Sequence, residues 1–404
     1  MSDGNRKNAA CTAQSTVTLE GQRTQGHATS GVARVPTSSS SFVDGPRRTL
    51  WAVGLAIAVG ACAGGGGPSQ ARDASGRTPG PRDAQISDDA SRASPDVGAA
   101  FDAGTARDAG RSSDALVADV PPVTGEILRL RDLAYPPPSG VTSNLATLDL
   151  FRRDDGQVRP LVLLVHGGSW AGGDKAGFEV KFAPWWIDRG YVAAPVNFRL
   201  ASMRGVTPVV KPQDQARDIA AALAWLLSNA QTYGIATEKV VLVGYSSGAH
   251  LVALLGTDER YLREAGVDET KVVASISLDV HVYDVPYALG LMVGSVVERN
   301  IPIIRHLFGQ TEAEQLTGSP INYLDGWAAS AFIVSVDQDP MAPGTHGYIV
   351  SQAAQRYVTA LRAAGHKADT LHESAKTHSE LVNEFGDPGD TISSAIETYL
   401  TTLP

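Results

Sequence analysis

The feature that most constrains the fold is a series of short, continuous apolar runs separated by longer segments with helical spacing. The runs are rich in Val, Leu and Ile, and they occupy residues 161–165, 240–243, 272–278 and 332–336, with a weaker, Ala-rich run at 192–196. Continuous apolarity is typical of strands buried on both faces. Helical spacing predicts a helix from Pro212 to about Ala230 and another around residues 353–364. Strands that alternate with helices predict an α/β fold, with a mostly parallel sheet and helices on both faces.

This pattern begins only after residue 121. Residues 63–121 consist largely of Gly, Ala, Ser, Asp, Arg and Pro, with hardly an aromatic residue. Such a stretch buries too little apolar area to offset the entropy lost on ordering, so it is predicted to be a disordered linker. Residues 122–404 are predicted to form the folded body. Within it, residues 281–326 fall between two sheet strands and are predicted to form a small helical cap.

An export signal is predicted at residues 47–62. Two arginines precede an apolar run that is too short to span a bilayer and has the form of a secretory h-region. The run ends in VGAC, which resembles a bacterial lipobox with Cys62 as the lipidated residue; an ordinary signal peptide cut near Ala61 or Ala63 is the alternative. Residues 1–46 are predicted to be a disordered extension or to precede the true start. We therefore expect an exported bacterial protein, lipid-anchored at the cell envelope.

Charge and cysteine content exclude several classes of function. The formal net charge is -9 and the pI is about 5.5, which argues against nucleic acid as a partner and leaves small neutral substrates open. The two cysteines are Cys11 and Cys62. The predicted body therefore contains no disulfide, zinc-thiolate site or cysteine nucleophile.

A candidate nucleophile lies in the sequence GYSSG at residues 244–248. This stretch directly follows the apolar run VVLV and leads into AHLVALLG, a predicted helix. A strand, a tight turn and a helix form the setting of a nucleophile elbow, so Ser246 is the predicted nucleophile. The backbone N–H of Ser247 would then point at a developing oxyanion. The alternative is a glycine-flanked turn without catalysis.

A second motif, HGGSW at residues 166–170, follows the apolar run LVLLV. Its glycines allow the backbone N–H groups of Gly167 and Gly168 to face the same oxyanion, which two donors stabilise better than one. In this motif the imidazole of His166 is expected to brace the loop by hydrogen bonds rather than to act as the base.

Together these motifs resemble the α/β-hydrolases of the carboxylesterase and kynurenine-formamidase type, close to bacterial acetyl- and feruloyl-esterase-like enzymes. The resemblance covers roughly residues 161–385 and rests on HGGSW followed by GDK, VNFRL, DQARDIAAALAWL, GYSSGAHLVALLG, VYDVP and THSELVNEFG. It implies an α/β-hydrolase fold and a Ser-His-Asp triad that needs neither a metal nor an organic cofactor.

The resemblance also suggests the acid of the triad. In the family, the turn after a late strand commonly reads D-x-x-V-P, and its first Asp orients the histidine. Here FIVSV is followed by DQDPMAP, in which Asp339 matches that spacing and Ala342 replaces the usual Val. Asp337, two residues earlier, is expected to serve the turn.

The base is predicted to be His378, which opens HSELVNEFG as the family's catalytic histidine does. His372, at the end of the predicted last strand, is the alternative. His281 and His306 precede the acid, which breaks the expected order of Ser, Asp and His, and His346 follows the acid too closely to come from a later loop.

We therefore expect a serine esterase that cleaves esters of short acyl or aryl acids through an acyl-Ser246 intermediate. Trp170, Tyr245 and Tyr283 are predicted to contact the small-molecule substrate, and for Tyr283 a packing role fits equally well. Arylformamidase action on N-formylkynurenine is an alternative, although export argues against it because tryptophan catabolism is intracellular. A non-catalytic binding module is a third possibility, but such proteins usually lose a triad member. A membrane is expected as a partner only through the lipid anchor.

Overall fold

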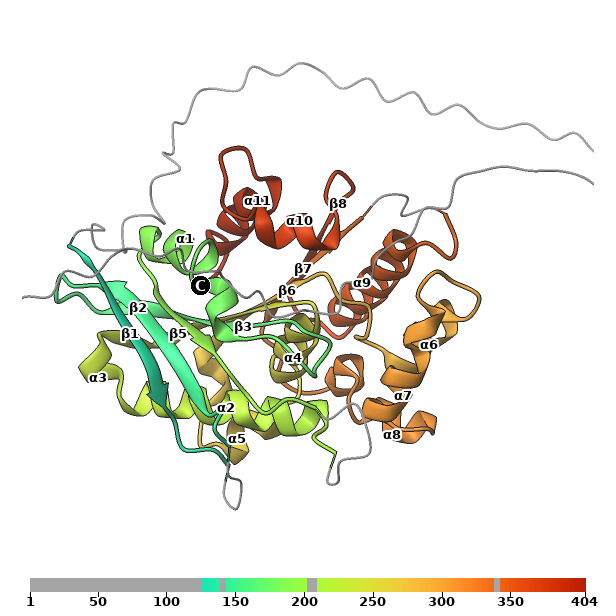
Figure 1. Cartoon of the computed structure of the whole chain (residues 1–404), viewed down its shortest axis with the longest axis horizontal. Helices are drawn as coiled ribbons and strands as arrows, with labels where there is room; N and C mark the ends of the chain where they lie inside the picture. Colours follow the sequence, from blue (N-terminus) through green and yellow to red (C-terminus); the bar gives the residue numbers. More distant parts are fainter. Residues whose placement is uncertain (1–124, 139–142, 202–208, 338–341) are drawn as a thin grey trace, which may run out of the picture. The chain divides into compact units, whose positions relative to one another are not determined.

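A computed structural model describes residues 125–138, 143–201, 209–337 and 342–404 (Figure 1). Its centre is an eight-stranded sheet with the strand order β1-β2-β4-β3-β5-β6-β7-β8. The strands are β1 (Ile127–Ala134), β2 (Thr147–Arg153), β3 (Arg159–Val165), β4 (Val192–Val196), β5 (Ile235–Tyr245), β6 (Val272–Leu278), β7 (Ser330–Val336) and β8 (Ala368–Glu373). β2 pairs antiparallel with both β1 and β4, and the pairs from β4 to β8 are parallel.

The strands are connected by helices and short 3-10 turns. The helices are α1 (Phe182–Asp188), α2 (Pro212–Ser228), α3 (Ala230–Tyr233), α4 (Ser247–Leu255), α5 (Arg260–Glu264), α6 (Val285–Met292), α7 (Ile301–Phe308), α8 (Glu312–Leu316), α9 (His346–Ala363), α10 (His378–Asn383) and α11 (Thr391–Leu400). The 3-10 turns are η2 (Lys175–Phe178), η3 (Glu269–Lys271), η4 (Glu298–Asn300) and η5 (Pro320–Tyr323). No helix in these described ranges has the length and apolarity needed to cross a bilayer.

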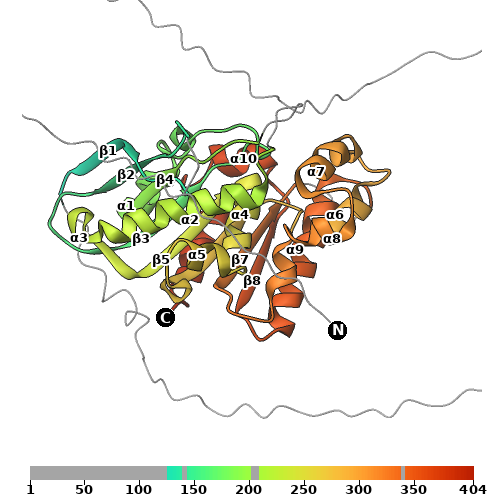
Figure 2. The ribbon, with the colours of Figure 1, turned by 90° about the horizontal axis from the view of Figure 1, so that it is seen from below.

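Helices cover both faces of the sheet, because alternate side chains of each central strand point to opposite sides. In β3, Leu161, Leu163 and Val165 belong to the core that also contains side chains of α2, α4 and α9, whereas Val162 and Leu164 belong to the core that also contains side chains of α1 and α11. Figure 1 shows the same division, with α2, α4 and α5 on one side of the sheet and α1 and α11 on the other, and Figure 2 looks onto the side that carries α2, α4 and α5. The predicted α/β architecture is therefore confirmed.

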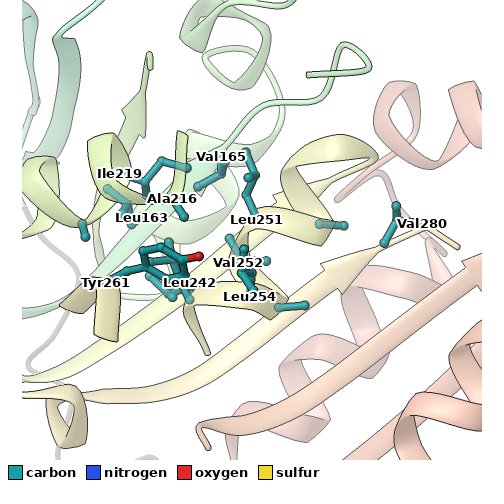
Figure 3. Packing of buried hydrophobic residues seen from close by; sticks show 14 of the residues in the cluster. Leu163, Val165, Ala216, Ile219, Leu242, Leu251, Val252, Leu254, Tyr261 and Val280 are labelled. Carbon is teal, nitrogen blue, oxygen red and sulfur yellow. The ribbon is translucent and has the colours of Figure 1, made fainter. Parts of the chain in front are cut away.

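The helix that begins beside the predicted nucleophile is embedded in the larger of the two cores. Leu251, Val252 and Leu254 of α4 are at most 1% exposed and lie against side chains of α2, β3 and β5 (Figure 3). Burying one such side chain fully contributes about 1.5–3 kcal/mol. The start of α4 is therefore fixed firmly against the sheet.

Most predicted elements agree with the structure, and two strands were missed. The expected strands 192–196 and 272–278 have the observed bounds, and the expected helix from Pro212 ends at Ser228. β1 and β2 were not predicted, and β1 exposes much of its length at the edge of the sheet. Residues 281–326 contain short helices, as expected. The linker, the export signal and Cys62 lie outside the described residues and stay predictions.

Candidate active site

Ser246 occupies the sharp turn between the end of β5 and the start of α4. Its backbone has φ 55° and ψ -124°, a conformation that a non-glycine residue adopts only under constraint. The turn is held by the N–H of Ser246, which donates to the carbonyl of Leu278 at 2.8 Å, and by its carbonyl, which accepts from Ala249 at 2.9 Å. This is the geometry of a nucleophile elbow.

Both flanking glycines of the elbow are required by close packing. A Cβ atom on Gly244 would collide with the carbonyl of Gly248, and a Cβ atom on Gly248 would collide with the carbonyl of Val165. The elbow therefore lies directly against the end of β3, where the HGGSW motif begins.

The loop that follows β3 lies against Ser246. A Cβ atom on Gly167 would come within 2.9 Å of the Cβ atom of Ser246, so only a glycine lets the two backbones approach this closely. The next three residues have positive φ: 126° at Gly168, 53° at Ser169 and 62° at Trp170. The expected oxyanion-hole residues Gly167, Gly168 and Ser247 are thus all part of the backbone around the nucleophile.

His166 braces this loop, as expected. Its Nδ1 lies 2.8 Å from the carbonyl oxygen of Gly167, and its ring stacks on Phe198 with the centroids 4.4 Å apart. Burial lowers the pKa of His166, although the Gly167 carbonyl and the nearby Asp174 carboxylate oppose this change. The imidazole is therefore neutral at pH 7, with Nδ1–H as the donor to Gly167.

The GDK sequence at residues 173–175 supports the same loop. The carboxylate of Asp174 accepts hydrogen bonds from the N–H of Ala176 and from the side chain of Asn197, both at 2.9 Å. Lys175 is buried, and its ammonium group lies 2.8 Å from the carboxylates of Asp132 and Asp149. This buried ion pair ties the loop to β2, and none of its charged groups contacts Ser246 in the described structure.

His378 is the first residue of α10. Thr377 and Glu380 form a capping box that fixes the start of this helix, and the imidazole of His378 is 36% exposed. Tyr245, the residue before Ser246, stacks on His378 with the ring centroids 4.7 Å apart, and its hydroxyl donates to the His378 carbonyl at 2.8 Å. The predicted base therefore contacts the residue next to the predicted nucleophile.

The carboxylate that contacts His378 belongs to Asp279. This residue directly follows β6, its side chain is fully buried, and its Oδ2 accepts a hydrogen bond from Nδ1 of His378. Its Oδ1 accepts from the N–H of Val336 at 3.0 Å. Burial alone would raise the pKa of Asp279, but the hydrogen bond and charge of His378 and the charge of His346 hold it below its ordinary value. Asp279 is therefore ionised at pH 7.

The sequence analysis missed Asp279 and favoured Asp339 instead. Asp339 lies outside the described residues, so its assignment stays a prediction. A signal for Asp279 was present, because an Asp directly follows the apolar run 272–278. The carboxyl ends of neighbouring parallel strands meet at one edge of the sheet, so this Asp is brought beside the elbow that follows β5.

Asp337 lies at the end of the next strand, where it pairs with a second histidine. Its carboxylate is 3.0 Å from Nδ1 of His346, and the His346 ring is 6.0 Å from the ring of His378 in an edge-to-face arrangement. Burial lowers the pKa of His346, but its hydrogen bond to the Asp337 carboxylate and the charges of Asp279 and Asp337 outweigh burial, so the net shift of the pKa is upward. The N–H of Asp337 also donates to the Lys376 carbonyl at 2.8 Å, and its expected role in the turn stays a prediction, because residues 338–341 lie outside the described residues.

Comparison with known proteins identifies the family. The family model described as BD-FAE matches residues 148–353, which is about half of the chain and includes the elbow, the oxyanion loop and Asp279. The chain belongs to the BD-FAE family. His378 lies beyond the matched segment, so its assignment as the base of this BD-FAE member stays a prediction that rests on its sequence motif.

Curated relatives of this BD-FAE chain are named as esterases. Esterase LipQ of Mycobacterium tuberculosis is 26% identical over 61% of this chain and 56% of its own length. The probable carboxylic ester hydrolase LipM of the same organism is 25% identical over 48% of this chain and 46% of its own length. The chain thus spans about half the length of the curated relatives it matches.

Solved structures show the same fold. Esterase B from Lactobacillus rhamnosis superposes with a TM-score of 0.52 at 19% identity, covering 71% of this chain and 88% of that chain. At this level of identity the likeness concerns the fold alone, and it confirms the α/β-hydrolase architecture.

The residues predicted to contact substrate have different environments in this BD-FAE chain. Trp170 is buried, and its indole packs edge-on against Phe308. Tyr283 is fully buried and stacks on Tyr357 with the ring centroids 4.6 Å apart. Tyr245 is partly buried beside His378. Substrate contact by these three residues stays a prediction. Within the described ranges, no cluster of three or more His, Cys, Asp or Glu side chains could hold a metal ion.

Proposed function

We propose that this protein is a carboxylic ester hydrolase that acts through an acyl-Ser246 intermediate. The observation that carries the proposal is the convergence of two features at one edge of the sheet. One is Ser246 in a constrained elbow with the Gly167 backbone packed against it, and the other is the hydrogen-bonded pair of His378 and Asp279. Tyr245 connects the two through its contacts with His378.

The proposed chemistry follows from the hydrogen-bond pattern of His378. Because the Asp279 carboxylate accepts from Nδ1–H, the lone pair of the neutral imidazole is on Nε2, where it can accept the Ser246 proton. The serine oxygen then forms a bond to the ester carbonyl carbon, and the carbonyl π electrons move to its oxygen. That oxyanion would accept hydrogen bonds from the N–H of Ser247 and from the backbone of the Gly167–Gly168 turn.

Collapse of this intermediate completes acylation. The bond from carbon to the leaving oxygen breaks, and the proton on Nε2 of His378 goes to the departing alcohol. A water molecule then attacks the acyl-serine, giving its proton to His378, which returns it to Ser246 as the acid leaves. The ionised, fully buried Asp279 stabilises the imidazolium that forms in each half of the reaction.

Relatives support an ester as the substrate class. LipQ and LipM carry the names esterase and probable carboxylic ester hydrolase, and a third relative, from Oryza sativa subsp. japonica, is named a probable isoprenylcysteine alpha-carbonyl methylesterase. All three names specify ester hydrolysis, and only the third specifies an ester. Together with the sequence motifs, they support our proposal of short acyl or aryl esters as substrates.

Active-site labelling tests the proposal. The folded chain is expected to react with a fluorophosphonate probe at Ser246, located by peptide mass spectrometry, and to release p-nitrophenol from p-nitrophenyl acetate. Ser246→Ala should lose both signals, while an excess of short-chain ester should slow the labelling of the wild-type chain. A folded chain with no adduct at Ser246 would contradict the proposal and favour a non-catalytic binding module.

A substrate panel sharpens the same test. Initial rates would be measured on p-nitrophenyl esters of increasing acyl length, on an aryl ester such as methyl ferulate, and on N-formylkynurenine. We expect kcat/KM to be highest on a short acyl or aryl ester. A higher kcat/KM on the formamide than on every ester would replace the esterase assignment with an arylformamidase.

We also propose that the protein is exported and lipid-anchored through Cys62, on the support of the sequence VGAC that follows an apolar run. Expression of the full chain in a bacterium with labelled palmitate should give a labelled membrane-associated protein. Cys62→Ser should remove the label. Release of an unlabelled, processed wild-type chain would instead indicate an ordinary signal peptide.

A further inference from the structure

His250 is a fully buried titratable residue that the reaction above does not use. It lies in α4, four residues after Ser246, and none of its surface is exposed. Its Nδ1 lies 3.3 Å from the indole Nε1 of Trp170, and its Nε2 lies 2.7 Å from the carbonyl oxygen of Gly318. It therefore contacts the end of the oxyanion loop on one side and the helical insertion on the other.

These two partners determine the protonation of the imidazole. An indole N–H only donates and a backbone carbonyl only accepts, so Nδ1 must accept and Nε2–H must donate. The neutral ring with its proton on Nε2 satisfies both contacts. Burial lowers the pKa of His250 to about 4, with the Gly318 carbonyl opposing the change. The ring is therefore neutral at pH 7, as the geometry requires.

The partner in the oxyanion loop is Trp170, a residue with a strained backbone conformation. Ser169 and Trp170 both have positive φ, a strained conformation that non-glycine residues keep only where their surroundings enforce it. The carbonyl of Trp170 is held by the side chain of Gln215 at 2.6 Å and by the N–H of Ala201 at 2.8 Å. The indole itself is held by the hydrogen bond to His250 and by edge-on packing against Phe308.

We propose that His250 is a positioning residue that fixes the oxyanion loop relative to the nucleophile. α4 begins immediately after Ser246, and the His250–Trp170 hydrogen bond joins its first turn to the loop that carries Gly167 and Gly168. The bond thereby sets the spacing between the serine oxygen and the backbone N–H groups of the oxyanion hole. This inference rests on the proposed esterase function.

The same residue links the site to the helical insertion. Gly318 follows α8, and its carbonyl accepts the second hydrogen bond of His250. Phe308, at the end of α7, packs edge-on against both Trp170 and His250, with centroid distances of 5.3 and 5.1 Å. A merely structural His250 would hold these elements together without any effect on the reaction, so the test must separate folding from turnover.

Two substitutions of His250 each keep one of its two hydrogen bonds and remove the other. His250→Asn places an amide oxygen near the position of Nδ1, so it keeps an acceptor for Trp170 and loses the reach to Gly318. His250→Gln places an amide nitrogen near the position of Nε2, so it keeps the donor to Gly318 and loses the acceptor. Both variants leave a space in the core, and their melting temperatures should fall by similar amounts.

Their turnover should differ. Removing one oxyanion-hole donor typically costs about 10²–10³ in kcat, so a misplaced loop in His250→Gln should lower kcat by roughly 10- to 100-fold, with KM little changed. His250→Asn should stay within about threefold of the wild-type kcat. Rates on p-nitrophenyl acetate would be divided by the amount of Ser246 that a fluorophosphonate labels to completion, so that unfolded protein is not counted.

Trp170→Phe removes the donor of the same hydrogen bond, so it tests the inference even if His250→Gln does not fold. It removes the indole N–H, keeps an aromatic ring, and should reproduce the loss in kcat. The double variant should be no slower than the slower single variant, because both changes remove one interaction.

Five outcomes are informative. Loss of kcat in His250→Gln with retention in His250→Asn supports the inference, as does non-additivity with Trp170→Phe. A kcat within twofold of wild type in both His250→Gln and Trp170→Phe overturns it, and so do equal losses in the Asn and Gln variants. If the wild-type chain itself neither hydrolyses esters nor labels at Ser246, the proposed function is what fails.

Discussion

The two halves of the candidate site are built differently. On the nucleophile side, Ser247, His250 and Trp170 are at most 5% exposed, and the backbone itself supplies the geometry. On the base side, the imidazoles of His378 and His346 are 36% and 25% exposed. That side is assembled from side chains at the ends of β6 and β7 and at the start of α9 and α10. The nucleophile side is therefore fixed by short sequence motifs, whereas the base side depends on tertiary pairing.

The largest expected effect comes from removing a single oxygen atom, the hydroxyl of Ser246, from the nucleophile side. Ser246→Ala should lower kcat on p-nitrophenyl acetate by about 10⁴-fold or more, because no other group can form the acyl intermediate. Ser247→Ala keeps the backbone N–H and should largely preserve kcat. A comparable loss in both variants would show that the hydroxyl of Ser247 takes part, which contradicts the division of roles between the two serines.

The next largest effect is expected on the base side, and it decides whether Asp279 or Asp339 is the acid that acts with His378. Asp279→Asn should lower kcat by roughly 10²- to 10⁴-fold, because an amide at this position no longer fixes the tautomer of His378 or stabilises the imidazolium. Asp339→Asn should change kcat much less. The reverse order, with the larger loss in Asp339→Asn, would restore the acid expected from the sequence and reduce Asp279 to a structural partner.

The same contrast explains what the sequence could predict. Ser246, Gly167 and Gly168 belong to motifs in which neighbours in the sequence are neighbours in space, so local chemistry was sufficient to assign them. The base could be placed because the family's histidine opens a characteristic segment. The carboxylate on His378 could not be placed in this way, because Asp279 and His378 are 99 residues apart and meet only when β6, β7 and β8 assemble.

The strands, too, could be predicted from the sequence only in part. Strands β3 to β7 are buried on both faces and appear as continuous apolar runs, so their existence followed from the sequence. β1 and β2 lie at the antiparallel end of the sheet, and β1 carries Arg129, Arg131 and Asp132 within its eight residues. An edge strand needs only part of its surface to be apolar, so its pattern does not stand out from a loop.

A third prediction uses pH, because one histidine in each half, His250 and His346, should respond in opposite directions. The pKa of His250 is lowered from 6.5 to about 4, so between these values the unfolded chain binds more protons than the folded one. The free energy of unfolding should therefore fall as the pH drops from 6.5 to 4, by about 3 kcal/mol from this residue. Urea unfolding at a series of pH values measures this, and His250→Asn should flatten the curve over the same range.

On the base side, the pKa of His346 is raised, and Asp337, Asp279, His281 and His378 are the titratable groups around it. The stability that His346 contributes is present in full below pH 6.5 and is lost as the pH rises through its folded pKa. His346→Gln should therefore flatten the curve above pH 6.5, and any change below pH 6.5 would come from His281, whose pKa the charge of His346 helps to lower. A curve altered only below pH 6.5 would contradict this assignment.

The smallest expected effect tests the residue that joins the two halves. Tyr245→Phe removes the hydrogen bond from the hydroxyl to the His378 carbonyl and keeps the stacked ring. One such bond contributes about 1 kcal/mol, so kcat should fall by about fivefold if the bond holds His378 in its reactive position. Tyr399→Phe is the matched control, because it removes a similar bond to Ser330, which lies at the opposite end of β7 from the site. Equal losses of stability with a lower kcat only in Tyr245→Phe would show that this tyrosine couples the base to the nucleophile, whereas an unchanged kcat would show that the two halves are positioned independently.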